Sequence, residues 1–250
     1  MVMTGRRWEA PEGIEHALVE LKSYDGSHTH HWKRRYDAVL CVAPLPLVAP
    51  VLDYLPESDG LRMVCLSSNN AALLQRNADY AALRDAEARL AASALDTVIL
   101  QPTAIAGRPG CPVLGYMSDR VASGRTLWLP GADTVQQPVH YRDVADAMLR
   151  ALSPRVSAGT YSVAGPEARS YGALAREVEC AFWTQADVRD VPVGAARALG
   201  RLLPSGREGA ALRRAGVDRL AVAPPLPGFT ARRGIADMLR GLTGPGGLPS

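Results

Sequence analysis

The sequence predicts an α/β protein built on a parallel sheet with helices on its faces. Short apolar segments alternate with longer amphipathic stretches through the first half of the chain, which is typical of repeated strand–helix units. The segment 37–43 is apolar almost throughout, as expected of a strand buried on both faces of a parallel sheet. Hydrophobic residues make up 47% of the chain and charged residues 21%, and this balance excludes a disordered protein.

The expected strands of the first half are apolar runs that end in turn residues. They cover 16–21, 37–43, 62–67 and 96–100. Pro44 and Pro46 end the second of them, and a short crossover helix is expected over 48–54. Asp79 is the expected N-cap of a helix over 80–92, where strong helix formers dominate. The turn-rich stretch 101–112 follows the last strand.

The second half has shorter strands, with turns marked by Pro and Gly. Strands are expected over 126–130 and 159–163. Asp143 is expected to cap one helix, and Ser170 begins another. The first of these helices has an apolar face at helical spacing, made by Val144, Ala147, Met148, Ala151 and Leu152.

Charge and cysteine usage exclude several classes of protein. The net charge is +3, and Lys and Arg are spread along the 250 residues, which argues against a nucleic-acid partner. No apolar run is long enough to cross a bilayer, and the N-terminus has no apolar signal-peptide core. The four cysteines form no CxxC pair, so a reducing compartment without disulfides is expected, and Cys41 and Cys65 have no basic neighbour that would make them reactive. We therefore expect a soluble cytoplasmic protein with no membrane partner.

Four local motifs occur in a familiar order. The strand end Leu66–Ser68 is followed by Tyr80–Arg84; three further matches are Ile99–Gly107, Pro138–Ala145 and Gly159–Gly165. This order resembles that of extended or atypical short-chain dehydrogenases/reductases, a family that includes nucleotide-sugar epimerases and dehydratases. The resemblance spans residues 2–242 and implies a single Rossmann-like domain over 1–250. It also implies that 108–138 and 164–250 contribute a small C-terminal α/β lobe on the substrate side.

The family opens with a strand, a GxxGxxG turn and a helix, which together hold the cofactor pyrophosphate. Here the first match, Val2–Arg7, resembles the second strand, and the glycines of 244–247 follow no expected strand. We therefore expect a Rossmann-like sheet that is incomplete at its N-terminus. A start site placed too far downstream, giving a truncated gene product, is one explanation for this departure.

The resemblance assigns catalytic roles to Ser68, Tyr80 and Arg84. Tyr80 would be the general acid/base, and Ser68 would position the substrate oxygen. The family has Lys four residues after the tyrosine, on the same helix face. Arg84 keeps the positive charge but is bulkier and does not lose its proton. The alternative is a surface tyrosine beside an exposed arginine.

The resemblance also implies a cofactor site and a substrate contact. Its cofactor positions are Arg6, Arg7, Glu20, Leu21, Ala43, Pro44, Gln101, Pro102 and Thr103. Arg6 and Arg7 suit a 2′-phosphate, which favours NADP, with NAD as the other option. Arg142 is the expected substrate contact, although residues such as Arg142 and Asp143 at a helix start are more often structural. His28, His30 and His31 lie in a basic loop without further ligands, so no metal is expected.

The function that follows is that of an NAD(P)-dependent oxidoreductase or sugar-epimerase-like protein. Its substrate would be a small hydroxy or carbonyl compound, or a nucleotide sugar. The alternative is a non-catalytic relative that serves as a binding or regulatory module. An incomplete first unit would leave a surface that a partner chain covers, so a homodimer is one expected form.

Overall fold

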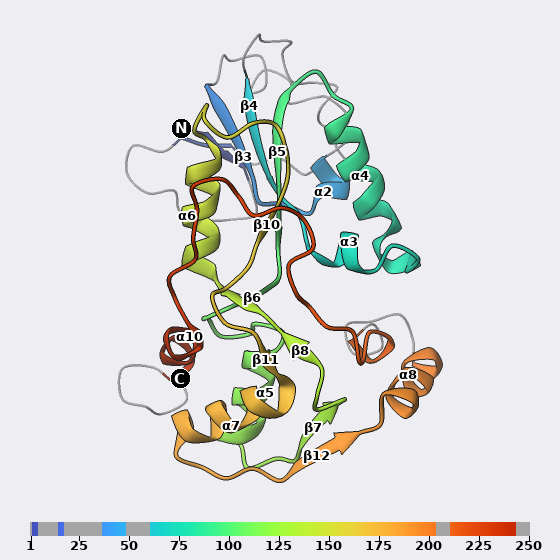
Figure 1. The fold of residues 1–250 in the computed structure, drawn as a ribbon. Helices are drawn as coiled ribbons and strands as arrows, with labels where there is room; N and C mark the ends of the chain where they lie inside the picture. Colours follow the sequence, from blue (N-terminus) through green and yellow to red (C-terminus); the bar gives the residue numbers. More distant parts are fainter. Residues whose placement is uncertain (1, 5–14, 18–36, 49–60, 204–210, 244–250) are drawn as a thin grey trace.

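The computed structural model describes residues 2–4, 15–17, 37–48, 61–203 and 211–243. Its central sheet has four parallel strands in the order β10-β5-β4-β3 (Figure 1). These strands are β3 (Ala38–Cys41), β4 (Arg62–Leu66), β5 (Asp96–Pro102) and β10 (Gly159–Val163). The parallel pairing of four strands, with helices in the connections between them, confirms the predicted α/β, Rossmann-like fold.

Helices cover both faces of this sheet. On one face α2 (Leu45–Val48) and α4 (Ala81–Ala91) pack on the sheet through a core that includes Leu45, Leu90 and Ile99. On the other face α6 (Tyr141–Ala151) packs against β4 and β5 (Figure 1). Four of its five expected apolar positions are fully buried, and Leu152 packs against the same cluster. Burial on both faces explains why the central parts of β4 and β5 are apolar.

A second group of elements gathers beyond the carboxyl ends of the central strands (Figure 1). It contains α5 (Leu114–Ala122), β7 (Leu127–Pro130), α7 (Tyr171–Phe182), β12 (Val188–Val191), α8 (Val193–Leu202) and α10 (Ile235–Thr243). Helices α5, α7 and α10 share one hydrophobic core, which includes Leu114, Leu174 and Met238. Strands β7 and β12 pair in parallel.

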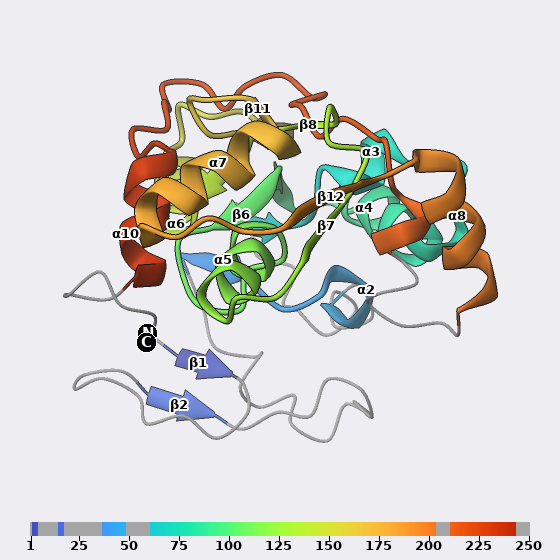
Figure 2. The same ribbon diagram turned by 90° about the horizontal axis from the view of Figure 1, so that it is seen from below.

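Short strand pairs complete the described fold. They are β6 (Ala104–Ala106) with β9 (Pro138–His140), β8 (Val135–Gln136) with β11 (Arg169–Ser170), and β1 (Val2–Thr4) with β2 (Glu15–Ala17). The β1–β2 pair lies to one side of the main body in Figure 2. Among the described residues, no helix combines the length and the hydrophobicity that crossing a bilayer requires.

Three helix starts, those of α2, α4 and α6, differ from the expectation. The helix after β3 covers Leu45–Val48 rather than 48–54, because Pro44 and Pro46 are both compatible with a first helical turn. Asp79 does not cap α4: the side chain of Asn77 accepts the Asp79 N–H at 2.8 Å and starts a 3₁₀ turn, Ala78–Tyr80, ahead of the helix. Ser170 does cap α7, as predicted.

Asp143 is not the cap of α6 either. His140 Nδ1 accepts the Arg142 N–H at 3.1 Å, so the helix begins at Tyr141. Asp143 is 2% exposed, and its carboxylate binds Arg233 through both the side chain and the backbone N–H. It therefore ties α6 to the chain that leads into α10.

His140 is also buried, 5% exposed, and its ring lies against Gly107. A Cβ on Gly107, whose φ is +94°, would come within 2.6 Å of the imidazole. Burial lowers the pKa of His140 from its ordinary 6.5, and the nearby Arg233 acts in the same direction. The cap requires the neutral ring, since protonated Nδ1 has no lone pair to accept the Arg142 N–H.

We expect acid to destabilise the fold through His140. Because the folded pKa lies below the unfolded value of 6.5, the unfolded chain binds the proton first. The free energy of unfolding should therefore be unaffected by His140 above pH 6.5 and should fall as the pH drops below it. Asn caps helices without titrating, so His140→Asn should remove this part of the pH dependence in urea unfolding. The same slope in both proteins would contradict the assignment.

Candidate functional site

The candidate site lies at the carboxyl ends of β3, β4 and β5, the edge where ligands bind in open parallel sheets. The chain leaves β4 through Ser67, Ser68 and Asn69 into the short helix α3 (Asn70–Leu73). It then reaches Tyr80 at the N-terminal end of α4. Figure 1 shows α3 and the start of α4 at this end of the sheet, facing the second group of elements.

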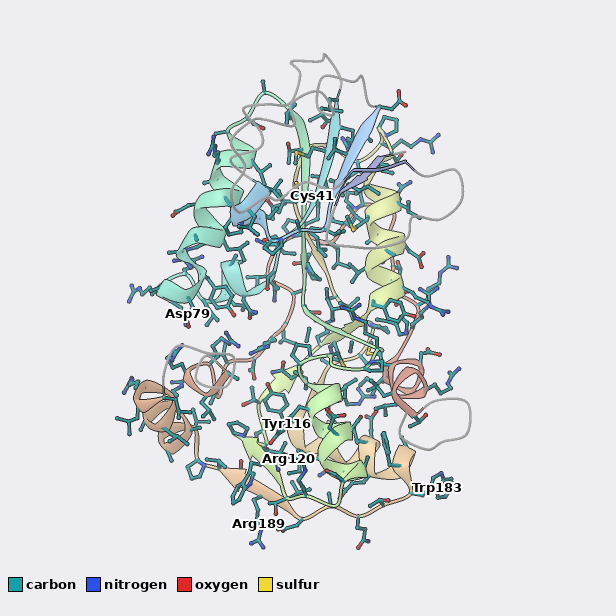
Figure 3. All side chains as sticks on the ribbon, turned by 180° about the vertical axis from the view of Figure 1, so that it is seen from behind. Cys41, Asp79, Tyr116, Arg120, Trp183 and Arg189 are labelled. Carbon is teal, nitrogen blue, oxygen red and sulfur yellow. The ribbon has the colours of Figure 1, made fainter. Side chains whose placement is uncertain are left out.

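Tyr80 meets an arginine from the far end of the chain. Arg214 Nη1 donates to Tyr80 Oη at 2.7 Å, and the Arg214 guanidinium carbon lies 5.7 Å from the centre of the tyrosine ring. The neighbouring residues form a second link, because Arg213 Nη2 and Asp79 Oδ2 lie 3.4 Å apart. Figure 3 shows Asp79 at this end of α4, on the side of the C-terminal segment.

Arg214 is in an electrostatically unusual position. Burial lowers its pKa, whereas Tyr80 and Asp79 oppose that shift. Its Nε is buried and has no hydrogen-bond partner among the described residues. A guanidinium 2.7 Å from the tyrosine oxygen is placed to stabilise charge that develops there in the transition state of a proton transfer.

Arg84, the cation that the sequence places near Tyr80, points to the turn before α4. Its guanidinium donates to the carbonyls of Leu74 and Asn77 at 3.0 and 3.3 Å. These bonds close the loop between α3 and α4. The cation that contacts the Tyr80 hydroxyl is therefore Arg214, which no local sequence pattern connects to Tyr80.

Ser68 and Asn69 form the end of β4. Ser68 Oγ accepts the Asn70 N–H at 3.3 Å, which begins the turn into α3. Asn69 is 2% exposed; its Nδ2 donates to the Leu220 carbonyl at 2.7 Å, while its Oδ1 has no partner among the described residues. The sequence did not single out Asn69, although its position beside Ser68 at a strand end was an available signal.

A second polar network lies under the end of β5. Gln101 Nε2 donates to both carboxylate oxygens of Glu87, at 3.0 and 3.1 Å, and Ser67 Oγ donates to the same carboxylate. Gln101 is 3% exposed, and its Oε1 lacks a partner among the described residues. The orphaned oxygens of Asn69 and Gln101 are buried acceptors at an edge where a ligand would bind.

The C-terminal segment crosses this edge. Leu220 binds Asn69, the Gln137 N–H donates to the Arg219 carbonyl at 3.2 Å, and the Ser162 N–H donates to the Pro224 carbonyl at 2.8 Å. Together with Arg214, these bonds join the two groups of elements over the candidate site. The site is therefore built from residues more than a hundred positions apart.

The remaining candidate residues are more scattered. Ala43 and Pro44 follow β3, and Pro44 is exposed. Pro102 is buried, and Thr103 Oγ1 donates to the Gln137 carbonyl. Arg142 is exposed and stacks on Tyr141, to whose hydroxyl it donates at 3.1 Å. The others lie outside the described residues: Arg6, Arg7, Glu20, Leu21, His28, His30 and His31.

A cavity of about 570 Å³ lies elsewhere, between α7 and α10. Its lining includes Ala173, Cys180, Leu239 and Arg240. Its lining does not include Tyr80, Ser68 or Asn69. The orphaned buried acceptors and the Tyr80–Arg214 bond lie instead at the sheet edge, which makes that edge the better candidate for a catalytic site.

Fold and site together define a Rossmann-like α/β protein with a polar site at the carboxyl edge of its sheet. No protein-family profile matches the sequence, and no curated protein is similar to it at the sequence level. Its fold is that of solved nucleotide-sugar epimerases and dehydratases.

Three solved structures illustrate this likeness. MoeE5 in complex with UDP-glucose and NAD has a TM-score of 0.67 and 16% identity, over 96% of this chain and 89% of MoeE5. A dTDP-glucose 4,6-dehydratase from Bacillus anthracis, in complex with NAD, has a TM-score of 0.65 and 13% identity over 92% and 79% of the two chains. UDP-glucose 4-epimerase from Thermotoga maritima, with UDP-glucose, has a TM-score of 0.61 and 11% identity over 92% and 84%.

Proposed function

We propose that this chain is an NAD(P)-dependent oxidoreductase or epimerase-like enzyme that acts on a nucleotide sugar. The observation that carries the proposal is the Tyr80 hydroxyl, held by Arg214 at the carboxyl edge of the sheet. The fold supports the same conclusion, since solved proteins that share it were determined with NAD and UDP-sugars. Fold alone does not specify chemistry, so the site residues must carry the argument.

The residues at the sheet edge fit the reactive end of a nicotinamide cofactor. Asn69 Oδ1 and Gln101 Oε1 are buried acceptors without partners among the described residues, and a carboxamide supplies the donors that such oxygens need. Ala43 and Pro44 would line the cofactor on the β3 side, and Thr103 on the β5 side. When bound, the nicotinamide ring supplies hydride transfer, which no amino-acid side chain performs.

The chain's own residues would handle the proton. Tyr80 would exchange a proton with a substrate hydroxyl or carbonyl oxygen, while Arg214 stabilises the charge that develops on the phenolic oxygen. Ser68 would donate a hydrogen bond to the same substrate oxygen while its Oγ still accepts the Asn70 N–H. The C-terminal segment over the site would exclude water from the reacting atoms.

We attribute a preference for NADPH over NADH to Arg6 and Arg7. Two guanidinium groups would bind a 2′-phosphate through charge-assisted hydrogen bonds. We expect NADPH to bind about tenfold more tightly than NADH, since one such bond contributes roughly 1.5–3 kcal/mol. Titration of the full chain, followed by nicotinamide fluorescence, measures both affinities.

The double variant R6E/R7E tests the preference for NADPH separately from the binding of a nicotinamide cofactor. It should lose the preference for NADPH while keeping affinity for NADH, because repulsion falls on the 2′-phosphate alone. Arg189→Glu is the matched control: Arg189 is 61% exposed and pairs only with Asp187 in the described structure, so both affinities should stay unchanged. Failure of the wild-type chain to bind either cofactor would instead favour a non-catalytic binding module.

A further inference from the structure

Cys41 and Cys65 face each other across two paired strands. They are register partners in the parallel ladder between β3 and β4. Register partners in neighbouring strands point to the same face of a sheet. Both thiols belong to the core under α2 and α4, where Cys41 is 7% exposed and Cys65 fully buried. Figure 3 shows Cys41 within this region of the sheet.

The geometry of a sheet suits a bond between these two sulfurs. Neighbouring strands lie about 4.8 Å apart, and disulfides form at Cα separations of about 4.4–6.8 Å. The side-by-side position of the two thiols also affects their acidity: the neighbouring Cys65 thiol lowers the pKa of Cys41, and the neighbouring Cys41 together with burial raises the pKa of Cys65. The register pairing therefore places the two cysteines on neighbouring strands at the spacing from which a disulfide forms.

We propose that Cys41 and Cys65 form an oxidisable dithiol, a modification site for small two-electron oxidants such as hydroperoxides. Cys41 is the attacking sulfur, because it is the more exposed of the two, at 7% against 0% for Cys65. It breaks the O–O bond of hydrogen peroxide, becomes a sulfenic acid and releases one water. Cys65 then displaces the sulfenic hydroxyl, which forms the S–S bond and releases a second water.

The other two cysteines lack this arrangement. Cys111 is buried in the core of α5, α7 and α10, where its sulfur accepts the Gly115 N–H at 3.1 Å. Cys180 is exposed on α7. Cys111 is the internal control for a buried thiol, and Cys180 is the control for an exposed one. The proposal does not depend on the proposed enzymatic function.

The test is peptide mapping of the folded full chain after brief treatment with hydrogen peroxide. Trypsin cleaves after Arg62, which separates Cys41 from Cys65, and it places Cys111 and Cys180 on two further peptides. After the peroxide is removed, the chain is denatured in the presence of an alkylating reagent, which blocks the buried free thiols as they become exposed. We expect one dominant cross-linked pair, Cys41 with Cys65, and its loss after reduction with dithiothreitol.

Two cysteine variants provide a further test of the cross-link. Cys65→Ala should abolish the cross-link and leave Cys41 as a sulfenic acid that dimedone traps, whereas Cys111→Ala should leave the cross-link unchanged. The peptide map of the oxidised wild-type chain tests the proposal even if Cys65→Ala fails to fold. Recovery of both peptides with blocked thiols would overturn the proposal, as would a cross-link that forms only when the chain is denatured before oxidation.

Discussion

Replacing Tyr80 by Phe is expected to lower turnover of a UDP-sugar by about 10²–10⁴-fold, the usual contribution of a positioned general acid/base. The substitution removes only the hydroxyl that Arg214 contacts and leaves the ring in place. Substrate affinity should change little, since the proton moves only in the transition state. The measurement is steady-state turnover of UDP-glucose and UDP-glucuronic acid in the presence of nicotinamide cofactor.

Tyr161→Phe is the matched control for this prediction. Tyr161, on β10, donates its hydroxyl to the Ser157 carbonyl at 3.0 Å, away from the candidate site, so turnover should stay within a factor of about two. Arg214→Gln should lower turnover as well, but less than loss of the hydroxyl itself. Full activity of Tyr80→Phe would rule out the proposed role of this residue.

Replacing Arg62 by Met is expected to destabilise the fold by about 3 kcal/mol, a large share of the 5–15 kcal/mol that holds a typical domain together. Arg62 is 7% exposed, and its guanidinium donates to the carbonyls of Ala151, Ser153 and Val156 at the end of α6. It also binds the Asp96 carboxylate at 2.6 Å. Methionine fills similar space but leaves these buried acceptors without a donor.

Urea unfolding followed by circular dichroism measures this loss. Arg189→Met is the control, because Arg189 is 61% exposed and its pair with Asp187 is open to solvent. That substitution should change the free energy of unfolding by no more than about 0.5 kcal/mol. Equal stability of the two variants would show that α6 does not depend on Arg62.

The secondary structure was largely predictable because its signals are local. The strands predicted over 37–43, 62–67, 96–100 and 159–163 correspond to the four strands of the central sheet. Helix starts were harder to predict. Asp79 and Asp143 were expected to cap helices, yet Asn77 and His140 do so, because several nearby polar residues compete for the same backbone N–H groups.

The candidate site, too, was only partly predictable from the sequence. The family resemblance assigned roles to Ser68 and Tyr80, and those roles stay predictions. The partner of Tyr80 was assigned to Arg84 on the assumption that residues four apart on a helix share a face. That assumption ignored the two carbonyls of the preceding turn, which bind Arg84 instead.

The sequence by itself determined the class of fold and the residues that could do chemistry, because periodicity and residue type are local properties. Only the tertiary structure decided which groups meet. It brought Arg214 to Tyr80, Leu220 to Asn69 and Cys41 to Cys65. The physical reason is that parallel strands join segments remote in sequence, so contacts across the sheet edge depend on how the whole chain packs.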